Sequence, residues 1–155
     1  MVNLAQQERD IDGVIFTPLT IISVADGDIL HGMKISEEGY QGFGEAYFSS
    51  IHHNSIKGWK RHFEMVLNMV VPIGKIRFVL FDDRKESTTL GYFQEIILSE
   101  DNYGRLTVPP MIWFGFQGIG EGRNLLLNIS NIPHDAKEQE NKELESITYN
   151  WSKDG

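Results

Sequence analysis

The chain is a succession of short apolar runs, separated by turns that contain glycine, proline or aspartate. About eight or nine runs rich in β-branched and aromatic residues follow one another at the roughly 8–12-residue spacing of all-β sandwiches and barrels. Only residues 136–144 (AKEQENKEL) favour a helix. The pattern therefore predicts an all-β sandwich or barrel with a short C-terminal helix.

Two of these runs, residues 64–72 and 75–83, flank Pro72, Ile73 and Gly74, and this spacing predicts a short hairpin connection. Residues 56–63, just before them, alternate in charge and bulk, as a strand with two distinct faces would. A lysine and a histidine on one face of this strand are the main chemical lead in the chain. The predicted faces are Ile56, Gly58, Lys60 and His62 on one side, and Lys57, Trp59, Arg61 and Phe63 on the other.

Length and composition fit a single domain over residues 1–155, with a polar, loose arm at residues 1–12. Hydrophobic residues make up 41% of the chain, which is enough for a core that needs no covalent staples. Cysteine is absent, so disulfides and thiolate metal sites are excluded. The net charge of −8 argues against a nucleic-acid partner but leaves room for a local basic pocket.

The chain carries no sign of a membrane or secretory protein. No apolar run reaches the ~20 residues that a membrane-spanning helix needs. The N-terminal sequence MVNLAQQERD does not resemble a signal peptide. We therefore expect a cytoplasmic protein without a membrane partner, and the lack of cysteine fits that compartment.

Three motifs resemble one known family. The first has the spacing D-x-R-x-x-S-x-T-x-G, the second reads L-S-x-x-N-x-x-x-L-x-V-P-P, and the third is a closing I-x-Y-x-W. Together they resemble the dTDP-4-dehydrorhamnose 3,5-epimerase family over roughly residues 45–151. The motifs stand at Asp82, Arg84, Ser87, Thr89 and Gly91, at residues 98–110, and at residues 147–151.

The resemblance implies a cupin jelly roll that acts on a nucleotide-linked 4-keto sugar. It further implies a cytoplasmic homodimer with no cofactor and no required metal. We expect the N-terminal strands to contribute the dimer interface. The activity implied is epimerisation, in which a proton is removed and returned beside the ketone.

The departures from the family pattern fall on its catalytic positions. The family motif R-G-L-H-Y corresponds here to residues 57–61, so that Lys57 keeps the positive charge and Lys60 replaces the catalytic histidine. The histidine that follows V-P-P in the family is Phe114 here, and the family's catalytic tyrosine falls at Leu127. The C-terminal segment that supplies an aspartate partner in the family has no counterpart before Gly155.

Epimerisation beside a ketone needs a base, an acid on the opposite face, and a group that holds the enolate oxygen. His62 lies two positions after Lys60, so the two share a strand face and are the predicted catalytic residues. Lys60 would stabilise the enolate, or act as the base if burial lowers its pKa. The alternative is a solvated strand face. The predicted substrate-binding residues are Lys57, for a phosphate, together with Trp59, Arg61 and Phe114, of which Phe114 could equally belong to the core.

Two other functions remain open from the sequence. The chain could be a sugar-nucleotide-binding cupin without turnover, or a 3,4-ketoisomerase, which uses the same class of proton shuttle. A transition metal is not expected, because metal cupins carry H-x-H where this chain has Lys60-x-His62, and a later histidine where it has Phe114. The adjacent His52 and His53 would point to opposite strand faces and are expected in a surface turn.

Overall fold

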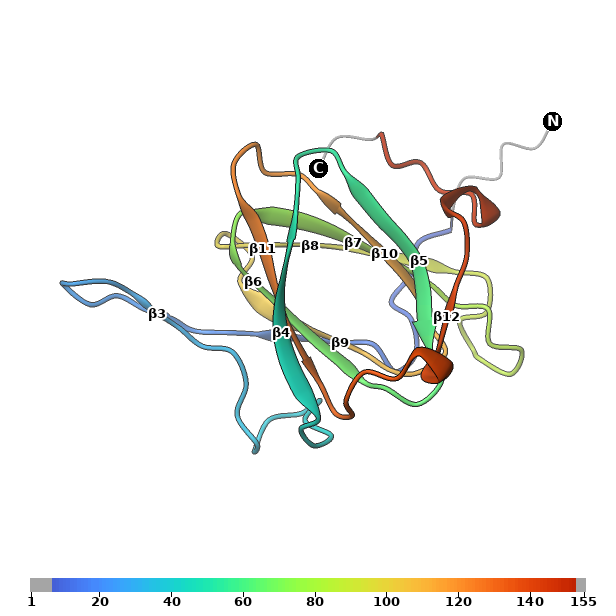
Figure 1. Ribbon diagram of the computed structural model, residues 1–155, viewed down its shortest axis with the longest axis horizontal. Helices are drawn as coiled ribbons and strands as arrows, with labels where there is room; N and C mark the ends of the chain where they lie inside the picture. The colour runs from blue at the N-terminus through green and yellow to red at the C-terminus, as the bar shows by residue number, and fades with distance from the viewer. Residues whose placement is uncertain (1–6, 153–155) are drawn as a thin grey trace.

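The computed structural model of the chain describes residues 7–152 and has two five-stranded antiparallel sheets that face each other (Figure 1). This arrangement confirms the predicted all-β sandwich. The first sheet has the order β1 (Ile15–Pro18), β9 (Gly104–Val108), β6 (Leu67–Ile73), β11 (Asn124–Ser130) and β4 (Glu45–Ile51). The second has the order β12 (Gln139–Asn141), β5 (Ile56–His62), β10 (Trp113–Gly118), β7 (Lys75–Phe81) and β8 (Phe93–Ser99). A small hairpin, β2 (Ile21–Ile22) and β3 (Ile29–Leu30), extends from the body.

Two hydrophobic clusters stabilise the sandwich. The main core lies between the sheets and includes Met69, Phe78 and Leu106, each at most 1% exposed. The second cluster lies on the outer face of the second sheet, where Trp59 and Trp113 are covered by the C-terminal segment. Burial on both faces explains why the central strands read as nearly continuous apolar runs.

The predicted hairpin of residues 64–72 and 75–83 is wrong. β6 pairs with β9 and β11 in the first sheet, whereas β7 pairs with β8 and β10 in the second. The connection therefore crosses between the sheets, and Gly74 makes it with a φ of 86°. A tight turn fixes only the distance between two strand ends. Which neighbours each strand finds depends on burial across the whole sandwich.

The helix expected at residues 136–144 is replaced by two 3-10 turns, η1 (Ala136–Glu138) and η2 (Leu144–Ser146), with β12 between them. β12 pairs with the edge of β5, and this pairing gives its backbone the partners that a helix would have supplied. Within residues 7–152, no helix has the length and apolar character needed to cross a membrane.

The part of the expected N-terminal arm that the structure describes is held against the sandwich. The Arg9 amide donates to the Phe93 carbonyl, and the Phe93 amide donates to the Gln7 carbonyl. Ile11 is 2% exposed and belongs to the main core. Residues 7–12 are therefore not loose, and residues 1–6 lie outside the described part of the chain.

Candidate functional site

A bulge in β5 places the basic residues of this strand on one wall. On β10, Phe114 pairs with Lys60 but Phe116 pairs with Lys57, so three steps on β5 oppose two steps on β10. An extra residue in one strand interrupts the alternation of faces. Lys57 therefore lines the same cavity as Lys60 and His62, whereas strict alternation had placed it on the opposite face.

This cavity, of about 360 Å³, lies between the two sheets at the end where β5 and β10 face β4 and β11. Its described lining contains two lysines and one histidine but no carboxylate. The rest of the wall combines aromatic and aliphatic side chains with uncharged polar ones. Its lining is Tyr47, Ser49, Lys57, Gly58, Trp59, Lys60, His62, Met69, Phe114, Phe116, Leu126, Asn128 and Asn141.

His62 and Glu138 form a buried pair at the inner end of this wall. The Nδ1 atom of His62 lies 2.6 Å from Oε1 of Glu138, and the two side chains are 8% and 7% exposed. The second carboxylate oxygen of Glu138 accepts from the backbone amides of Glu64 and Met65, at 3.0 and 2.9 Å. With Nδ1 engaged as a donor to a carboxylate, the Nε2 atom of His62 keeps its lone pair.

Local structure explains why Glu138 reaches His62. Asp135 caps η1 by accepting from the Lys137 amide at 2.9 Å. η1 ends at Glu138, and the next residue, Gln139, pairs directly with His62 as β12 begins. The last residue of the turn therefore lies beside the end of β5 and projects inward.

The electrostatics of the pair favour a neutral histidine beside an ionised glutamate. Burial lowers the pKa of His62, the Glu138 carboxylate opposes this, and the charge of Lys60 lowers the pKa further. Burial would raise the pKa of Glu138, but the hydrogen bonds from Glu64, His62 and Met65 outweigh it, so that this pKa is lowered. A neutral imidazole with one nitrogen fixed by a carboxylate is the form that accepts a proton.

The remaining cavity residues supply positive charge and an apolar surface. Lys57 Nζ donates to the Ser50 carbonyl at 2.9 Å and to Ser49 Oγ at 3.3 Å, which holds the ammonium between β5 and β4. Phe114 is 8% exposed, belongs to the main core and also stacks on the His62 ring at a centroid distance of 6.1 Å. It therefore fits both roles considered from the sequence.

Two side chains that were predicted to bind substrate, Arg61 and Trp59, bind other groups of the protein. Arg61 donates to Glu140 at 2.7 Å and to Asp83 at 3.3 Å, and its guanidinium lies 4.8 Å from the centre of the Trp113 ring. Trp59 contributes to the cavity wall, but its indole lies in the outer cluster and donates to the Leu144 carbonyl at 2.9 Å. The structure brings Lys57, Lys60, His62 and Phe114 together and leaves Arg61 outside.

Comparison with known proteins places the chain in a family. No protein-family model matches it. A solved dTDP sugar isomerase from Desulfovibrio desulfuricans G20 is 33% identical, with a TM-score of 0.89 and coverage of 94% of each chain. This chain belongs to the dTDP-4-dehydrorhamnose 3,5-epimerase family, as a divergent member.

Two further relatives are similar over different lengths. The dTDP-4-dehydrorhamnose 3,5-epimerase of Bacillus anthracis shares the fold, with a TM-score of 0.80 and 18% identity over 96% of this chain and 90% of its own. A probable low-salt glycan biosynthesis epimerase, Agl13 of Haloferax volcanii, is 30% identical over 105 residues, or 67% of this chain. That match spans 65% of the length of Agl13.

The shared D-x-R-x-x-S-x-T-x-G motif of the family fixes a loop. Asp82 is fully buried and accepts from Arg84 Nε at 2.9 Å, Ser87 Oγ at 2.5 Å and Thr89 Oγ1 at 2.6 Å. Burial would raise the pKa of Asp82, but these hydrogen bonds hold it well below its ordinary value. This agrees with the interpretation that a carboxylate and a guanidinium two residues apart order a loop.

The structure adds four cavity-lining residues, and the buried partner of His62, that the sequence did not reveal. Leu127, at the family's tyrosine position, lies between the cavity-lining residues Leu126 and Asn128 on β11 and therefore faces away. Tyr47 and Ser49 alternate along β4, so the strand pattern could have found them. Nothing in the sequence pointed to Glu138, because its segment was expected to be helical. The added residues are Tyr47, Ser49, Asn128, Asn141 and Glu138.

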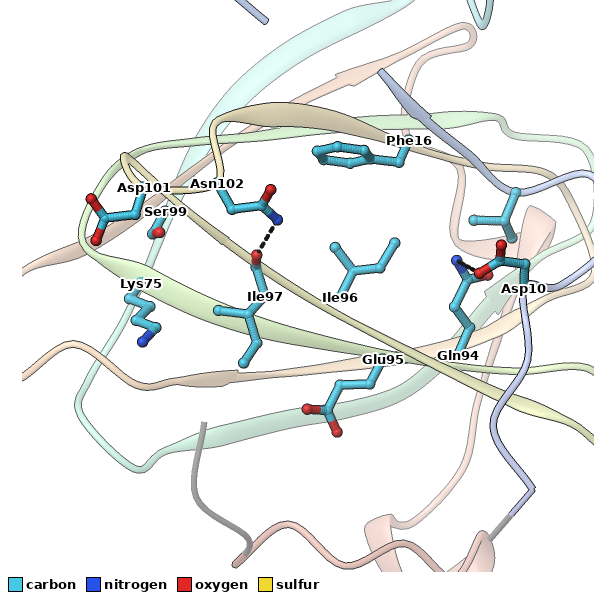
Figure 2. Close-up of a pocket in the computed structure, with 11 residues that line it drawn as sticks. Asp10, Phe16, Lys75, Gln94, Glu95, Ile96, Ile97, Ser99, Asp101 and Asn102 are labelled. Atoms are coloured by element: carbon cyan, nitrogen blue, oxygen red, sulfur yellow. Dashed lines mark hydrogen bonds between the residues drawn. The ribbon is translucent and has the colours of Figure 1, made fainter. Parts of the chain in front are cut away.

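A larger cleft of about 820 Å³ opens at the other flank, between β8 and the segment that leads into β1 (Figure 2). Its centre is apolar, with Phe16 and Ile96, and its ends carry Asp10 on one side and Asp101 with Lys75 on the other. Its amides serve the fold: Gln94 accepts from the Ile11 amide at 2.9 Å, and Asn102 donates to the Ile97 carbonyl at 2.8 Å. The carboxylates at its rim would repel the negative charge of a nucleoside diphosphate.

The adjacent His52 and His53 do not form a metal centre with acidic side chains in the described residues. His53 is exposed, and its Nδ1 lies 3.0 Å from the Ile119 carbonyl, in a turn as expected. Across residues 7–152, no three His, Asp or Glu side chains gather in a way that could hold a metal ion.

Proposed function

We propose that this protein is an epimerase or isomerase that acts on a nucleotide-linked 4-keto sugar, with His62 as the base that removes a proton beside the ketone. The observation that carries the proposal is the buried His62–Glu138 pair, which opens onto a cavity with two lysines. The names of the similar proteins support the same chemistry, since they include a dTDP sugar isomerase and a glycan biosynthesis epimerase.

Each residue has a role that its position supports. Glu138 fixes the His62 tautomer and stabilises the imidazolium that forms when the proton is taken. Lys60 stabilises the negative charge on the enolate oxygen, because an ammonium is most effective where charge develops in a site that excludes water. Lys57 lies between β5 and β4 and binds the diphosphate. Phe114 and the apolar wall receive the sugar ring.

The pair argues against a cupin that only binds its ligand. Burying a histidine and a carboxylate is costly unless both are fully hydrogen-bonded, and a binding pocket for an anionic ligand gains nothing from an added carboxylate. A 3,4-ketoisomerase is the second candidate. The solved relative with 33% identity is named a dTDP sugar isomerase, a term that covers this reaction as well as epimerisation, and the same base would serve both.

The proposal includes a cytoplasmic homodimer. The β2–β3 hairpin projects from the body and exposes apolar side chains, with Ile22, Val24 and Ile29 at 41%, 47% and 52% exposure. Exposed apolar groups on a projecting hairpin are typical of a surface that another chain covers. Light scattering at micromolar concentration should give the mass of a dimer, and Ile29→Lys should give a monomer. Ile35→Lys, at an exposed apolar residue outside the hairpin, is the control.

The deciding experiment is incubation with dTDP-4-keto-6-deoxyglucose in heavy water, followed by nuclear magnetic resonance. We expect deuterium at C3, C5 or both for an epimerase, and the labelled carbon together with the product identifies the reaction. His62→Gln should lower the exchange rate by about 10²–10⁴-fold. His52→Asn, at an exposed histidine outside the cavity, is the matched control. Binding of the sugar nucleotide without any exchange would instead identify the non-catalytic cupin.

A further inference from the structure

Tyr47 lies on the wall of the cavity opposite His62. β4 belongs to the first sheet, and its residues alternate so that Tyr47 and Ser49 line the cavity. His62 and Lys60 line it from β5, in the second sheet. A sugar ring in this cavity would therefore have the imidazole on one side and the phenol on the other.

Asn128 holds the Tyr47 hydroxyl. The two residues are direct partners across the β11–β4 pair, and Asn128 Nδ2 donates to the Tyr47 hydroxyl at 2.8 Å. The hydroxyl thus acts as an acceptor, and because Tyr47 is 47% exposed its own hydrogen is open to solvent or to a ligand in the cavity. This hydrogen bond fixes the position of the phenol oxygen at the cavity wall.

A second buried polar atom at this wall lacks a partner. Asn128 is 4% exposed, and its Oδ1 has no hydrogen-bond partner within the described part of the chain. A buried acceptor without a partner is rare, because leaving it unpaired costs free energy. The unpaired Asn128 Oδ1 lies in the side chain that holds the Tyr47 hydroxyl, so a hydroxyl-bearing ligand in the cavity would supply the donor that this polar pair lacks.

We propose that Tyr47 is the catalytic acid on the face opposite His62, and that Asn128 is its positioning residue; this inference rests on the proposed function. His62 Nε2 takes the proton from the carbon beside the ketone, and the C–H electron pair forms the enolate. The carbon then takes the hydroxyl proton of Tyr47, and the enolate electrons return to re-form the carbonyl. Solvent reprotonates the phenolate and takes the proton from His62, so the enzyme ends unchanged. Inversion follows because the proton leaves from one face and arrives at the other.

The test is Tyr47→Phe with dTDP-4-keto-6-deoxyglucose in heavy water, with separate measurement of inverted product and of deuterium in recovered substrate. His62 can still remove a proton and return a deuteron on its own face. We therefore expect formation of the inverted product to fall by about 10²-fold or more, while exchange into recovered substrate persists. Tyr92→Phe removes the same hydroxyl outside the cavity and should change neither rate.

Asn128→Asp tests the positioning role, because a carboxylate would accept the phenol hydrogen and keep it from the substrate. Inversion should fall while exchange is retained, whereas a general loss of structure would lower both together. Inversion by Tyr47→Phe at the wild-type rate would overturn this inference alone. Absence of any deuterium uptake by the wild-type protein would overturn the proposed function and this inference with it.

Discussion

His62 Nδ1 lies 2.6 Å from Glu138 Oε1, and the two residues come from segments 76 positions apart in the chain. The family's aspartate partner was expected to be missing, and the histidine stands two positions beyond the family's base. The structure nevertheless pairs the histidine of the cavity wall with a buried carboxylate. The first two predictions below follow from this pair.

Glu138→Gln should slow deuterium exchange by about 10²-fold, because the amide no longer fixes the His62 tautomer or stabilises the imidazolium. Glu138→Ala should also lower the free energy of unfolding by roughly 3 kcal/mol, since it leaves His62 and two backbone amides without their buried acceptor. Exchange rates and urea denaturation measure the two effects. Glu140→Gln, whose carboxylate pairs with Arg61 outside the cavity, should retain the exchange rate.

The pH dependence of exchange should follow His62. Burial lowers its pKa, so the neutral base persists below the ordinary histidine value of about 6.5 and is lost only as the pH falls through the lowered pKa. The acid limb of kcat/KM should therefore lie below pH ~6.5. Glu138 raises this pKa, so Glu138→Gln should move the acid limb to still lower pH. An acid limb above the ordinary value would contradict the assignment of His62 as the base.

Substitution of Lys57 should mainly weaken ligand binding, whereas substitution of Lys60 should mainly lower the exchange rate. Lys57→Ala removes the charge proposed for the diphosphate and should weaken dTDP binding by about tenfold while exchange at saturating substrate continues. Lys60→Ala removes the charge beside the enolate oxygen and should abolish exchange while binding stays nearly intact. Calorimetry with dTDP and exchange at saturation distinguish the two. Equal effects of both changes on both measurements would show that the roles are not divided in this way.

Asp82→Asn should destabilise the fold without touching the cavity. The side chain is fully buried and accepts from Arg84, Ser87 and Thr89, so the change should lower the free energy of unfolding by roughly 3 kcal/mol near pH 7. Because the folded pKa is depressed, this stabilisation is present above pH ~4 and is lost as the pH falls further. The difference between wild type and variant in urea should therefore shrink in acid. Asp26→Asn, in an exposed turn, is the control.

Residues 56–62 show which parts of the site could be predicted from the alternation of residues along one strand. Alternation along a strand correctly placed Lys60 and His62 on one wall. The bulge opposite Phe114 and Phe116 moved Lys57 to the same wall, and a bulge depends on the partner strand rather than on the strand itself. Arg61 was predicted to bind substrate, but its carboxylate partners, Asp83 and Glu140, lie at distant positions in the sequence.

The all-β class, the family and the interpretation of the Asp82 loop could be predicted from local properties of the chain, namely apolar periodicity, turn residues and short motifs. Three other features depend on long-range packing: β6 and β7 lie in different sheets, Glu138 contacts His62, and Tyr47 lines the cavity opposite His62. These relationships join residues that are far apart in sequence. Their geometry is set by which strands pair and which faces are buried, and no local pattern in the chain encodes that choice.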